Sequence, residues 1–486
     1  MKLIATSVIE KTLKRLRRRW KAMRLAGETE ESQRLSIIAD LKKSGQIKSV
    51  SDVFAALNLK ITSRATGVAS HIDLHASARS TVCDALSHIA SATGELIFVL
   101  GGEGVWRKID KNTKAAFSKP RNKGYLEIAV TDRAYRLVSR HSINFWKENG
   151  NVLEASSSNA PVKKIVGPYD VSFPLQIIAC DTEIQPVDVV YTWVNSDDPA
   201  WQELMAPYRG ANTVDYDRYK QVDELRYSLR SLFTFAPWVR KVFIFTNCSP
   251  PAWFVPSERV LWVMHDEVIP EHYLPLFSSH SIETFIHQIP GLSERYVYFN
   301  DDVFLSAPVE PLDFFTPYNQ SVSRMEPSGV IHFLQGLVKT GEAEEWQHAA
   351  ANSAELLLKH TNILPTKLHR HTPHAFLRSV YVKMEQTFTA QMEITRSARF
   401  RNETDFSFTS FIYHHYARAA GNAVHIDEEG MIVRSTNYKR FLERKIYTKQ
   451  RFFCINDGGG SASDPHFRKF KQEFLSTFYC FKSPAE

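Results

Sequence analysis

Runs of apolar residues that stop abruptly at polar side chains recur from residue 187 onward. The clearest runs cover residues 187–194, 242–246, 260–264 and 296–299. Near-continuous apolar runs of this kind are typical of strands that are buried on both faces of a parallel sheet. Residues 223–235 have helical apolar spacing between the first two runs. This order of elements predicts a doubly wound α/β domain in this part of the chain.

Carboxylate and amide side chains follow two of these predicted strands. Asn195 and Asp197 come after the first strand. Asn300, Asp301 and Asp302 come directly after the fourth. Because ligands of open α/β sheets bind outside the carboxyl ends of the strands, we expect these side chains to border one site. Adjacent buried carboxylates are costly without a positive charge beside them, which a divalent cation carrying a nucleotide diphosphate would supply. An Asp-rich turn without a ligand is the alternative.

The N-terminal part of the chain has a different pattern. Residues 8–25 have apolar side chains at steps of three and four, and eight Lys and Arg cover the remaining positions. This pattern favours a helix on an anionic membrane surface, with Trp20 at headgroup level. Packing against the rest of the protein and a nucleic-acid-binding arm are the alternatives. We therefore expect a basic helical segment over 1–60, a small α+β accessory domain over 61–170, and the α/β domain over 171–486.

Composition narrows the function classes. The 486-residue chain carries a formal net charge of +7, which favours phosphate-bearing partners or an anionic surface. Its five cysteines are scattered without a CxxC pair, so a structural zinc site or a disulfide framework is not expected. The chain has neither an apolar run long enough to span a membrane nor a signal-peptide pattern. We expect a cytoplasmic protein, either free or peripheral on the inner face of the plasma membrane.

Three further groups of residues carry candidate chemistry. The histidine-dense stretch 369–374 does not match HExxH, but one of its imidazoles could act as a general base near neutral pH. Residues 396–405 contain three arginines, and Asp405 could orient one of them for phosphate binding. Arg226 and Arg230 lie four apart on the predicted helix, where they would either bind phosphates or form a solvated face.

Four blocks of sequence together resemble the Stealth family, which includes the animal lysosomal-enzyme N-acetylglucosamine phosphotransferase and bacterial capsule polymerases. Their order and spacing cover about residues 186–480, and the residues before 185 fall outside the resemblance. The blocks are Asp188-Val-Val-Tyr-Thr-Trp-Val-Asn195; Asp223-Glu-Leu-Arg-Tyr-Ser-Leu-Arg-Ser231 through Ala236-Pro-Trp-Val239, Phe277-Ser-Ser279 and Gly291-Leu-Ser293 to Asn300-Asp-Asp302; His371-Thr-Pro-His374 with Arg401-Asn-Glu-Thr-Asp405; and Phe453-Cys-Ile-Asn-Asp457.

The resemblance implies a GT-A-like, Rossmann-type catalytic domain that transfers a whole sugar-1-phosphate. A UDP-sugar would be the donor and a hydroxyl of an oligosaccharide or lipid-linked glycan the acceptor, with UMP released and a phosphodiester-linked capsular polysaccharide formed. Nucleic acid is not among the implied partners. A metal-dependent GT-A glycosyltransferase, which attacks the anomeric carbon instead, is the alternative. A non-catalytic protein that binds anionic polymers is a third.

The resemblance also implies roles for individual residues, in line with catalysis of phosphoryl transfer by positioning and charge stabilisation. Asp302 would hold Mg²⁺ or Mn²⁺ with help from Asp301 and Asn456. His374 would accept the proton of the acceptor hydroxyl, and Arg401 would stabilise charge on the transferred phosphoryl group. The remaining expected contacts to the nucleotide or substrate are Asp188, Thr192, Asn195, Asp197, Arg226, His280, Asn300 and Asp405.

Overall fold

The computed structural model describes two groups of residues, one on each side of a gap over 167–184. The predicted basic helix over 8–25 lies outside the described residues. No helix among the described residues is long and apolar enough to cross a membrane. The described ranges are 50, 60–66, 69–76, 79–92, 96–101, 104–109, 125–156, 163–166, 185–208, 219, 221–458 and 460–486.

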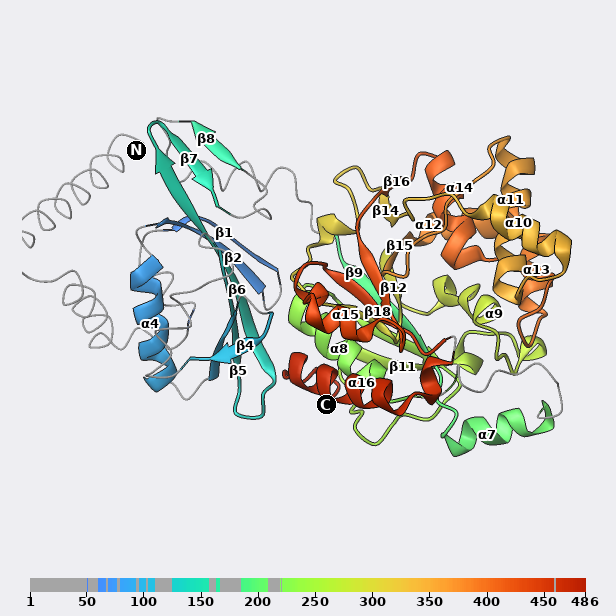
Figure 1. The fold of residues 1–486 in the computed structure, drawn as a ribbon, viewed down its shortest axis with the longest axis horizontal. Coiled ribbons are helices and arrows are strands. Elements are labelled where there is room, and N and C mark those ends of the chain that lie inside the picture. The colour runs from blue at the N-terminus through green and yellow to red at the C-terminus, as the bar shows by residue number, and fades with distance from the viewer. Residues whose placement is uncertain are drawn as a thin grey trace, which may run out of the picture.

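A five-stranded sheet lies at the centre of the C-terminal part (Figure 1). Its order is β11 (Val260–Met264), β10 (Val242–Thr246), β9 (Val187–Trp193), β12 (Arg295–Asn300) and β15 (His374–Leu377). The first four strands are parallel, and β15 is antiparallel to β12. The chain moves from β9 to β10 and β11, then returns to place β12 on the other side of β9. The four predicted strands and the α/β class are confirmed, and the strand order reverses between β9 and β12.

Helices cover both faces of this sheet (Figure 1). Successive side chains of a strand point to opposite faces. The hydroxyl of Tyr191 therefore meets Ser228 on one face, whereas that of Tyr298 meets Glu283 on the other. The first face thus carries α8 (Glu224–Phe235) and the other carries α9 (Ser279–Glu283). The other helices of this part are α7 (Pro199–Met205), α10 (Ile331–Thr340), α11 (Glu345–Thr361), α12 (Arg378–Thr387), α13 (Thr389–Arg396), α14 (Tyr413–Ala419), α15 (Tyr438–Glu443) and α16 (Pro465–Phe478).

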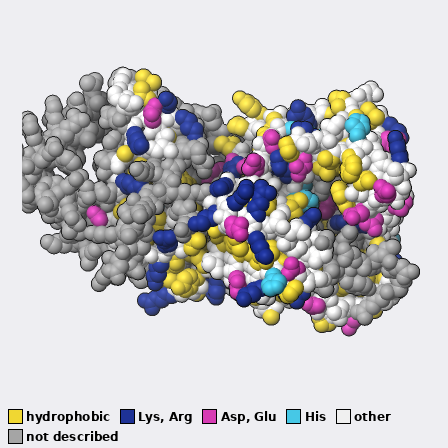
Figure 2. Space-filling model, viewed as in Figure 1, with side chains coloured by type: hydrophobic (Ala, Val, Ile, Leu, Met, Phe, Trp, Pro, Cys, Tyr) yellow, Lys and Arg dark blue, Asp and Glu magenta, His cyan; other side chains and the backbone are white. Residues whose placement is uncertain are grey.

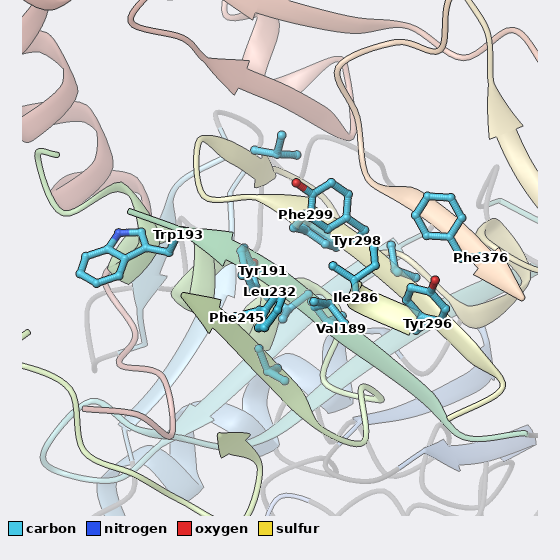
Figure 3. Packing of buried hydrophobic residues seen from close by; sticks show 14 of the residues in the cluster. Val189, Tyr191, Trp193, Leu232, Phe245, Ile286, Tyr296, Tyr298, Phe299 and Phe376 are labelled. Carbon is cyan, nitrogen blue, oxygen red and sulfur yellow. The ribbon is translucent and has the colours of Figure 1, made fainter. Parts of the chain in front are cut away.

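Aromatic and branched side chains fill the core between these layers (Figure 3). Tyr296 of β12 packs on Phe376 of β15, with 5.3 Å between the ring centroids. Tyr191 of β9 lies 5.3 Å from Phe299 of β12 in the same way. The neighbouring strands at the site are thus held in register by ring contacts between side chains as well as by their backbone hydrogen bonds.

Two small sheets bring the end of the chain to the end of β12. The strands β13 (Val303–Leu305), β18 (Phe452–Ile455) and β17 (Gly430–Val433) form one sheet, and β14 (Ser321–Arg324) pairs with β16 (Ala423–Ile426) in the other. The backbone N–H of Ile455 donates to the carbonyl of Asp302 at 2.9 Å. The residues that follow β18 therefore lie beside the turn between β12 and β13.

The N-terminal described residues form a separate mixed sheet with its own core. Helix α4 (Arg79–Ala92) covers one face through Val82, Leu86 and Ile89, which are buried with Ile128 and other strand residues. The strand order is β1-β2-β6-β5-β3-β4, and β7 and β8 extend β6. The bounds are β1 Lys60–Thr66, β2 Ala69–His75, β3 Leu96–Leu100, β4 Trp106–Lys108, β5 Tyr125–Thr131, β6 Leu137–Asn149, β7 Val152–Ala155 and β8 Lys164–Val166.

Candidate active site

The turn between β12 and β13 presents the predicted pair of carboxylates. The amide of Gln221 donates to Asp301 Oδ2 at 2.6 Å. Asp302 Oδ2 accepts hydrogen bonds from Cys454 Sγ and Asn456 Nδ2, both at 3.2 Å. The other oxygen, Asp302 Oδ1, is buried and has no hydrogen-bond partner among the described residues. The pair therefore keeps acceptor capacity that the protein itself does not satisfy.

An excess of negative charge surrounds this pair. Burial raises the pKa of Asp301, and repulsion from Asp302 and Glu224 raises it further. Burial also raises the pKa of Asp302. Lys471 of α16, almost fully buried, binds Glu224 at 2.6 Å and Asp457 at 2.7 Å. It therefore neutralises the acids that flank the pair, while Asp301 and Asp302 have no such partner among the described residues.

This donor set fits a divalent cation. Mg²⁺ and Mn²⁺ prefer oxygen ligands, and Asp301 with the unsatisfied Oδ1 of Asp302 offers them. Asn456 donates from Nδ2 to Asp302, and its Oδ1 accepts from the backbone N–H of Gly458 at 3.0 Å. These two bonds fix the amide beside Asp302, and the second lone pair of Oδ1 is still available to a cation.

His374 begins β15 and is paired with Tyr298 of β12, so it lies near the same end of the sheet as the carboxylates. Its Nδ1 lies 2.9 Å from Nε2 of His414. The His374 side chain is 6% exposed, and none of the described residues hydrogen-bonds to its Nε2 in the structure. Burial lowers the pKa of His374 to about 3. The imidazole is therefore neutral at physiological pH and has a lone pair available.

His369, His374 and His414 form a buried group whose ring nitrogens lie within 4.8 Å of one another. The group does not offer three free lone pairs. His369 Nε2 accepts from the backbone N–H of Arg324 at 3.0 Å, so its Nδ1 donates to the carbonyl of Arg370 at 2.7 Å. These contacts favour a packed histidine network over a metal site.

A hydrogen-bonded chain crosses from β9 to α9 beside Arg401. Thr192 Oγ1 lies 2.8 Å from the hydroxyl of Tyr298, which in turn donates to Glu283 Oε1 at 3.1 Å. Burial raises the pKa of Glu283 to about 7, against the opposing charge of Arg401. Arg401 donates from Nη2 to Ser279 Oγ at 2.6 Å. Sequence analysis did not single out Glu283, whose only local signal is its place at the end of α9, after Ser279, His280 and Ser281.

His371 connects these separate groups. It is exposed on the surface and interacts electrostatically with Asp302, with Arg401 and with Arg434. His374 also lies within electrostatic range of His371. Asp302, His374 and Arg401 therefore all lie within electrostatic range of one side chain, that of His371. Arg434 is a further basic residue of this region that sequence analysis did not single out.

Two predicted nucleotide contacts line a cavity of about 360 Å³ at the carboxyl end of β9. Asn195 and Asp197 line it, together with the aromatic rings of Trp193 and Trp253. Gln221 also lines the cavity and hydrogen-bonds to the acidic pair, so the cavity adjoins the carboxylates. A cavity with aromatic walls next to a charged centre suits a nucleotide base with its phosphates.

Three other predicted contacts, Asn300, His280 and Asp405, do not line the cavity. Asn300 ends β12 and pairs with Thr192 across the sheet. His280 Nδ1 lies 3.0 Å from Asp405 Oδ2, which also accepts from the backbone N–H of Asn402 at 3.2 Å. Asp405 is fully buried. It holds the loop after α13 and the ring of His280, and it leaves no surface that a sugar could touch.

Asp188 is wrong as a substrate contact, because it is fully buried near the start of β9 and forms an ion pair with Arg240. The backbone N–H of Ser293 also donates to it, at 2.8 Å. Arg226 lies beside the cavity, since its guanidinium is 5.7 Å from the centroid of the Trp253 ring, which lines it. Its Nε donates to Glu486 at 2.6 Å.

Among solved structures, the galactosyltransferase LgtC in complex with donor and acceptor sugar analogues aligns with 62% of this chain and 97% of its own, at 9% identity and a TM-score of 0.31. Mouse xyloside xylosyltransferase 1 aligns with 57% of this chain and 99% of its own, at 10% identity and a TM-score of 0.29. These scores are low, and the α/β assignment rests on the strand order described above.

Sequence relatives are more similar. Capsular polysaccharide phosphotransferase SacB of Neisseria meningitidis serogroup A is 31% identical over 378 residues, which are 75% of this chain and 66% of SacB. The chain thus matches just under two thirds of the length of this relative. Exopolysaccharide phosphotransferase SCO6023 of Streptomyces coelicolor is 38% identical over 314 residues, which are 62% of this chain and 52% of that protein.

Three models of Stealth protein conserved regions match the chain in their numbered order. Conserved region 1 matches residues 185–213, region 2 matches 218–323 and region 3 matches 370–418. The matches contain β9, the acidic pair, His374 and Arg401. The chain belongs to the Stealth family.

Proposed function

We propose that the protein is a sugar-1-phosphate transferase of polysaccharide synthesis, with residues 171–486 as its catalytic domain and 61–170 as an accessory domain. It moves a hexose-1-phosphate from a UDP-sugar to a hydroxyl of a saccharide acceptor and releases UMP. The single observation that supports the proposal is that Asp302, His374 and Arg401 all lie within electrostatic range of His371. The names of the relatives supply the reaction class.

The proposed chemistry follows from where these side chains lie. The acceptor oxygen attacks the β-phosphorus, and the bond from that phosphorus to the bridging oxygen breaks, so that UMP leaves with the bridging oxygen. His374 Nε2 takes the hydroxyl proton. The pKa of His374 is low without substrate because of burial, and the negative charge of a bound diphosphate raises it toward the range of a general base.

Arg401 stabilises the charge on the transferred phosphoryl group, and the hydrogen bond to Ser279 fixes part of its guanidinium. The cavity beside Asn195 and Asp197 receives the nucleoside. Asp301 and Asp302 would hold Mg²⁺ or Mn²⁺, which when bound neutralises the negative charge of the diphosphate. Asn456 keeps Asp302 oriented toward this centre.

The test is a screen of UDP-sugars with oligosaccharide primers, followed by ³¹P NMR. A new phosphodiester resonance together with UMP is the expected result. Release of UDP without a phosphodiester would assign the protein to the metal-dependent glycosyltransferases instead. No nucleotide release from any donor would exclude both reactions.

Once the protein is shown to be active, single substitutions test the roles of Asp302, His374 and Arg401. Asp302→Asn, His374→Gln and Arg401→Gln should each fold and lose activity by about 10²–10³-fold, the typical effect of losing one charge-stabilising group. His332→Gln, on an exposed position of α10, is the control and should retain full activity. A folded and fully active variant at any of the first three positions would refute the role given to that residue.

A further inference from the structure

A strip of exposed basic side chains begins beside the acidic pair and continues along α15. Between residues 434 and 449 the only acidic residue is Glu443. Figure 2 shows Lys and Arg side chains gathered over the position of α15. The basic strip consists of Arg434, Lys439, Arg440, Arg444, Lys445 and Lys449, all of them exposed.

The helix α15, which carries much of the strip, packs against the protein core. Phe441 of α15 is fully buried, and its ring lies 5.1 Å from that of Phe453 in β18. The backbone N–H of Arg434 donates to Asn437 Oδ1 at 2.8 Å, and Asn437 Nδ2 donates to the carbonyl of Ile432 at 2.9 Å. The apolar side of α15 is therefore fixed to the core, and the basic side chains project outward.

Most of these charges are not neutralised by acidic residues within the part of the chain that the structure describes. Arg434, Lys439, Arg440, Arg444 and Lys449 form no ion pair with any acidic residue that the structure describes. The contrast is Arg451, two residues after the strip, which binds Asp313 and Glu428. A row of uncompensated cations raises the local concentration of anionic partners.

The strip starts at the candidate active site. Arg434 interacts electrostatically with His371 and with Cys454, and Cys454 hydrogen-bonds to Asp302. Arg434 directly follows β17, whose last residue Val433 pairs with Ile455 of β18. When the terminal unit of an acceptor chain is in the site, the preceding units of that chain can therefore lie along α15.

We propose that the basic strip binds the phosphodiester backbone of the growing acceptor chain. This inference rests on the proposed function, because each transfer of a sugar-1-phosphate adds one phosphodiester and hence one negative charge to the acceptor. An acceptor with one negative charge in each repeat is bound best by a row of cations that leads away from its reacting end. The basic strip is such a row. The protein is accordingly a polymerase that holds its product.

A membrane surface is a poorer occupant of the strip. Helices that lie on membranes insert several large apolar side chains below their charged face. Among the exposed large apolar residues of the described chain, Leu442 alone belongs to α15. The strip offers charge without an apolar anchor.

The test is a binding measurement by calorimetry that requires no catalysis. The probe is a short poly(glycerol phosphate), compared with neutral dextran of similar length. The strip variant combines Lys439→Gln, Arg440→Gln and Arg444→Gln. The matched control combines Lys339→Gln, Lys383→Gln and Arg418→Gln, which removes the same charge from exposed positions on α10, α12 and α14.

The unmodified protein should bind poly(glycerol phosphate), should not bind dextran, and should lose affinity as NaCl is raised. The strip variant should bind roughly tenfold more weakly, whereas the control should change by less than twofold because its charges lie outside the strip. Equal weakening of both variants, or equal binding of dextran, would overturn the proposal. Strip-dependent binding to phosphatidylglycerol vesicles without binding of poly(glycerol phosphate) would overturn it too and would assign the strip to a membrane.

The same variants separate this inference from the proposed function. With an active preparation, the strip variant should transfer normally to a short neutral primer and poorly to a long phosphodiester-linked one. If the unmodified protein transfers to no primer, the proposed function fails. The binding measurement still tests the strip in that case, because binding does not depend on transfer. Normal elongation of long primers by the strip variant would overturn the role of the strip alone.

Discussion

The hydrogen bond between His374 and His414 determines which nitrogen of His374 is free to accept a proton. Burial lowers the pKa of His414, so its ring is neutral and carries one N–H. Its Nδ1 lies 2.8 Å from Ser323 Oγ, and we expect this nitrogen to donate to that oxygen. Its Nε2 then accepts from Nδ1 of His374, and Nε2 of His374 stays unprotonated.

This arrangement makes His414 a positioning residue. His414→Phe should lower turnover by about 10–100-fold with little change in KM, since general base catalysis contributes about 10²–10⁴-fold and orientation is part of that contribution. His414→Gln, whose side-chain oxygen can accept the same hydrogen bond, should restore part of the rate. The control is His415→Phe, which removes a ring that contacts the carbonyl of Lys367 instead.

The readout for His414 includes the tautomer of His374. Nitrogen-15 NMR of the unmodified protein should show a protonated Nδ1 on His374, and the spectrum of His414→Phe should show a mixture of tautomers. A protonated Nε2 in the unmodified protein would contradict the argument, whatever the rates are.

Glu283 should make stability depend on pH in a defined window. Its pKa is raised by burial from an ordinary 4.5 to about 7 in the folded protein. Between these values the unfolded chain has lost the proton and the folded chain has kept it, so stability falls as the pH rises through this window. Relative to Glu283→Gln, the unmodified protein should lose roughly 3 kcal/mol between pH 4.5 and 7. Urea unfolding of both proteins at several pH values measures this difference, and a constant difference would contradict the raised pKa.

At the scale of helices and strands, the sequence could predict what is local. The apolar run of β12 and its polar end at Asn300 are contiguous, so the strand and its carboxylates were found together. Contacts between distant segments could not be found this way. Asp188 meets Arg240, and Glu224 meets Lys471 some 247 positions away. Periodicity assigns a residue to a strand or helix but does not identify the partner that neutralises its charge.

The ion pairs of Lys471 attach α16 to the rest of the site. Its ammonium group lies between Glu224 of α8 and Asp457 after β18. Removing one member of a buried ionic group leaves uncompensated charge, so Lys471→Met should lower the free energy of unfolding by about 3–5 kcal/mol. The loss should shrink at low pH, where the two carboxylates are protonated.

Lys469→Met is the matched control for this prediction. Lys469 lies on the same helix and pairs with Glu473 at the surface, where both side chains are about 70% exposed. Exposed pairs contribute at most about 1 kcal/mol, so this variant should unfold almost like the unmodified protein in urea. Equal losses for the two variants would show that Lys471 does not hold α16 in place.

In the whole molecule, the N-terminal sheet contacts the C-terminal part through the buried Arg140, through a backbone bridge between Arg136 and Lys482, and through a group of rings. Arg140 of β6 donates to the carbonyls of Thr234 and Phe235 at the C-terminal end of α8, at 3.1 and 3.0 Å. It also forms an ion pair with Glu127 at 3.2 Å. The Phe98 ring packs at 4.9 Å from Phe481. A cation at the end of a helix is favourable there, because the last carbonyls carry partial negative charge.

Arg140→Met should therefore weaken the contact between the N-terminal sheet and α8 as well as the N-terminal sheet itself. The variant leaves Glu127 buried without its partner and removes both donors to α8, which should cost about 3–5 kcal/mol. Arg133→Met, at an exposed position of the same sheet, should cost little. Limited proteolysis should then release the N-terminal part from the Arg140→Met variant sooner than from the Arg133→Met variant. Adding Glu127→Gln to Arg140→Met should recover the part of the lost unfolding free energy that comes from the unpaired carboxylate. If the double variant is as unstable as Arg140→Met alone, the bonds to α8 carry the attachment and the ion pair contributes nothing.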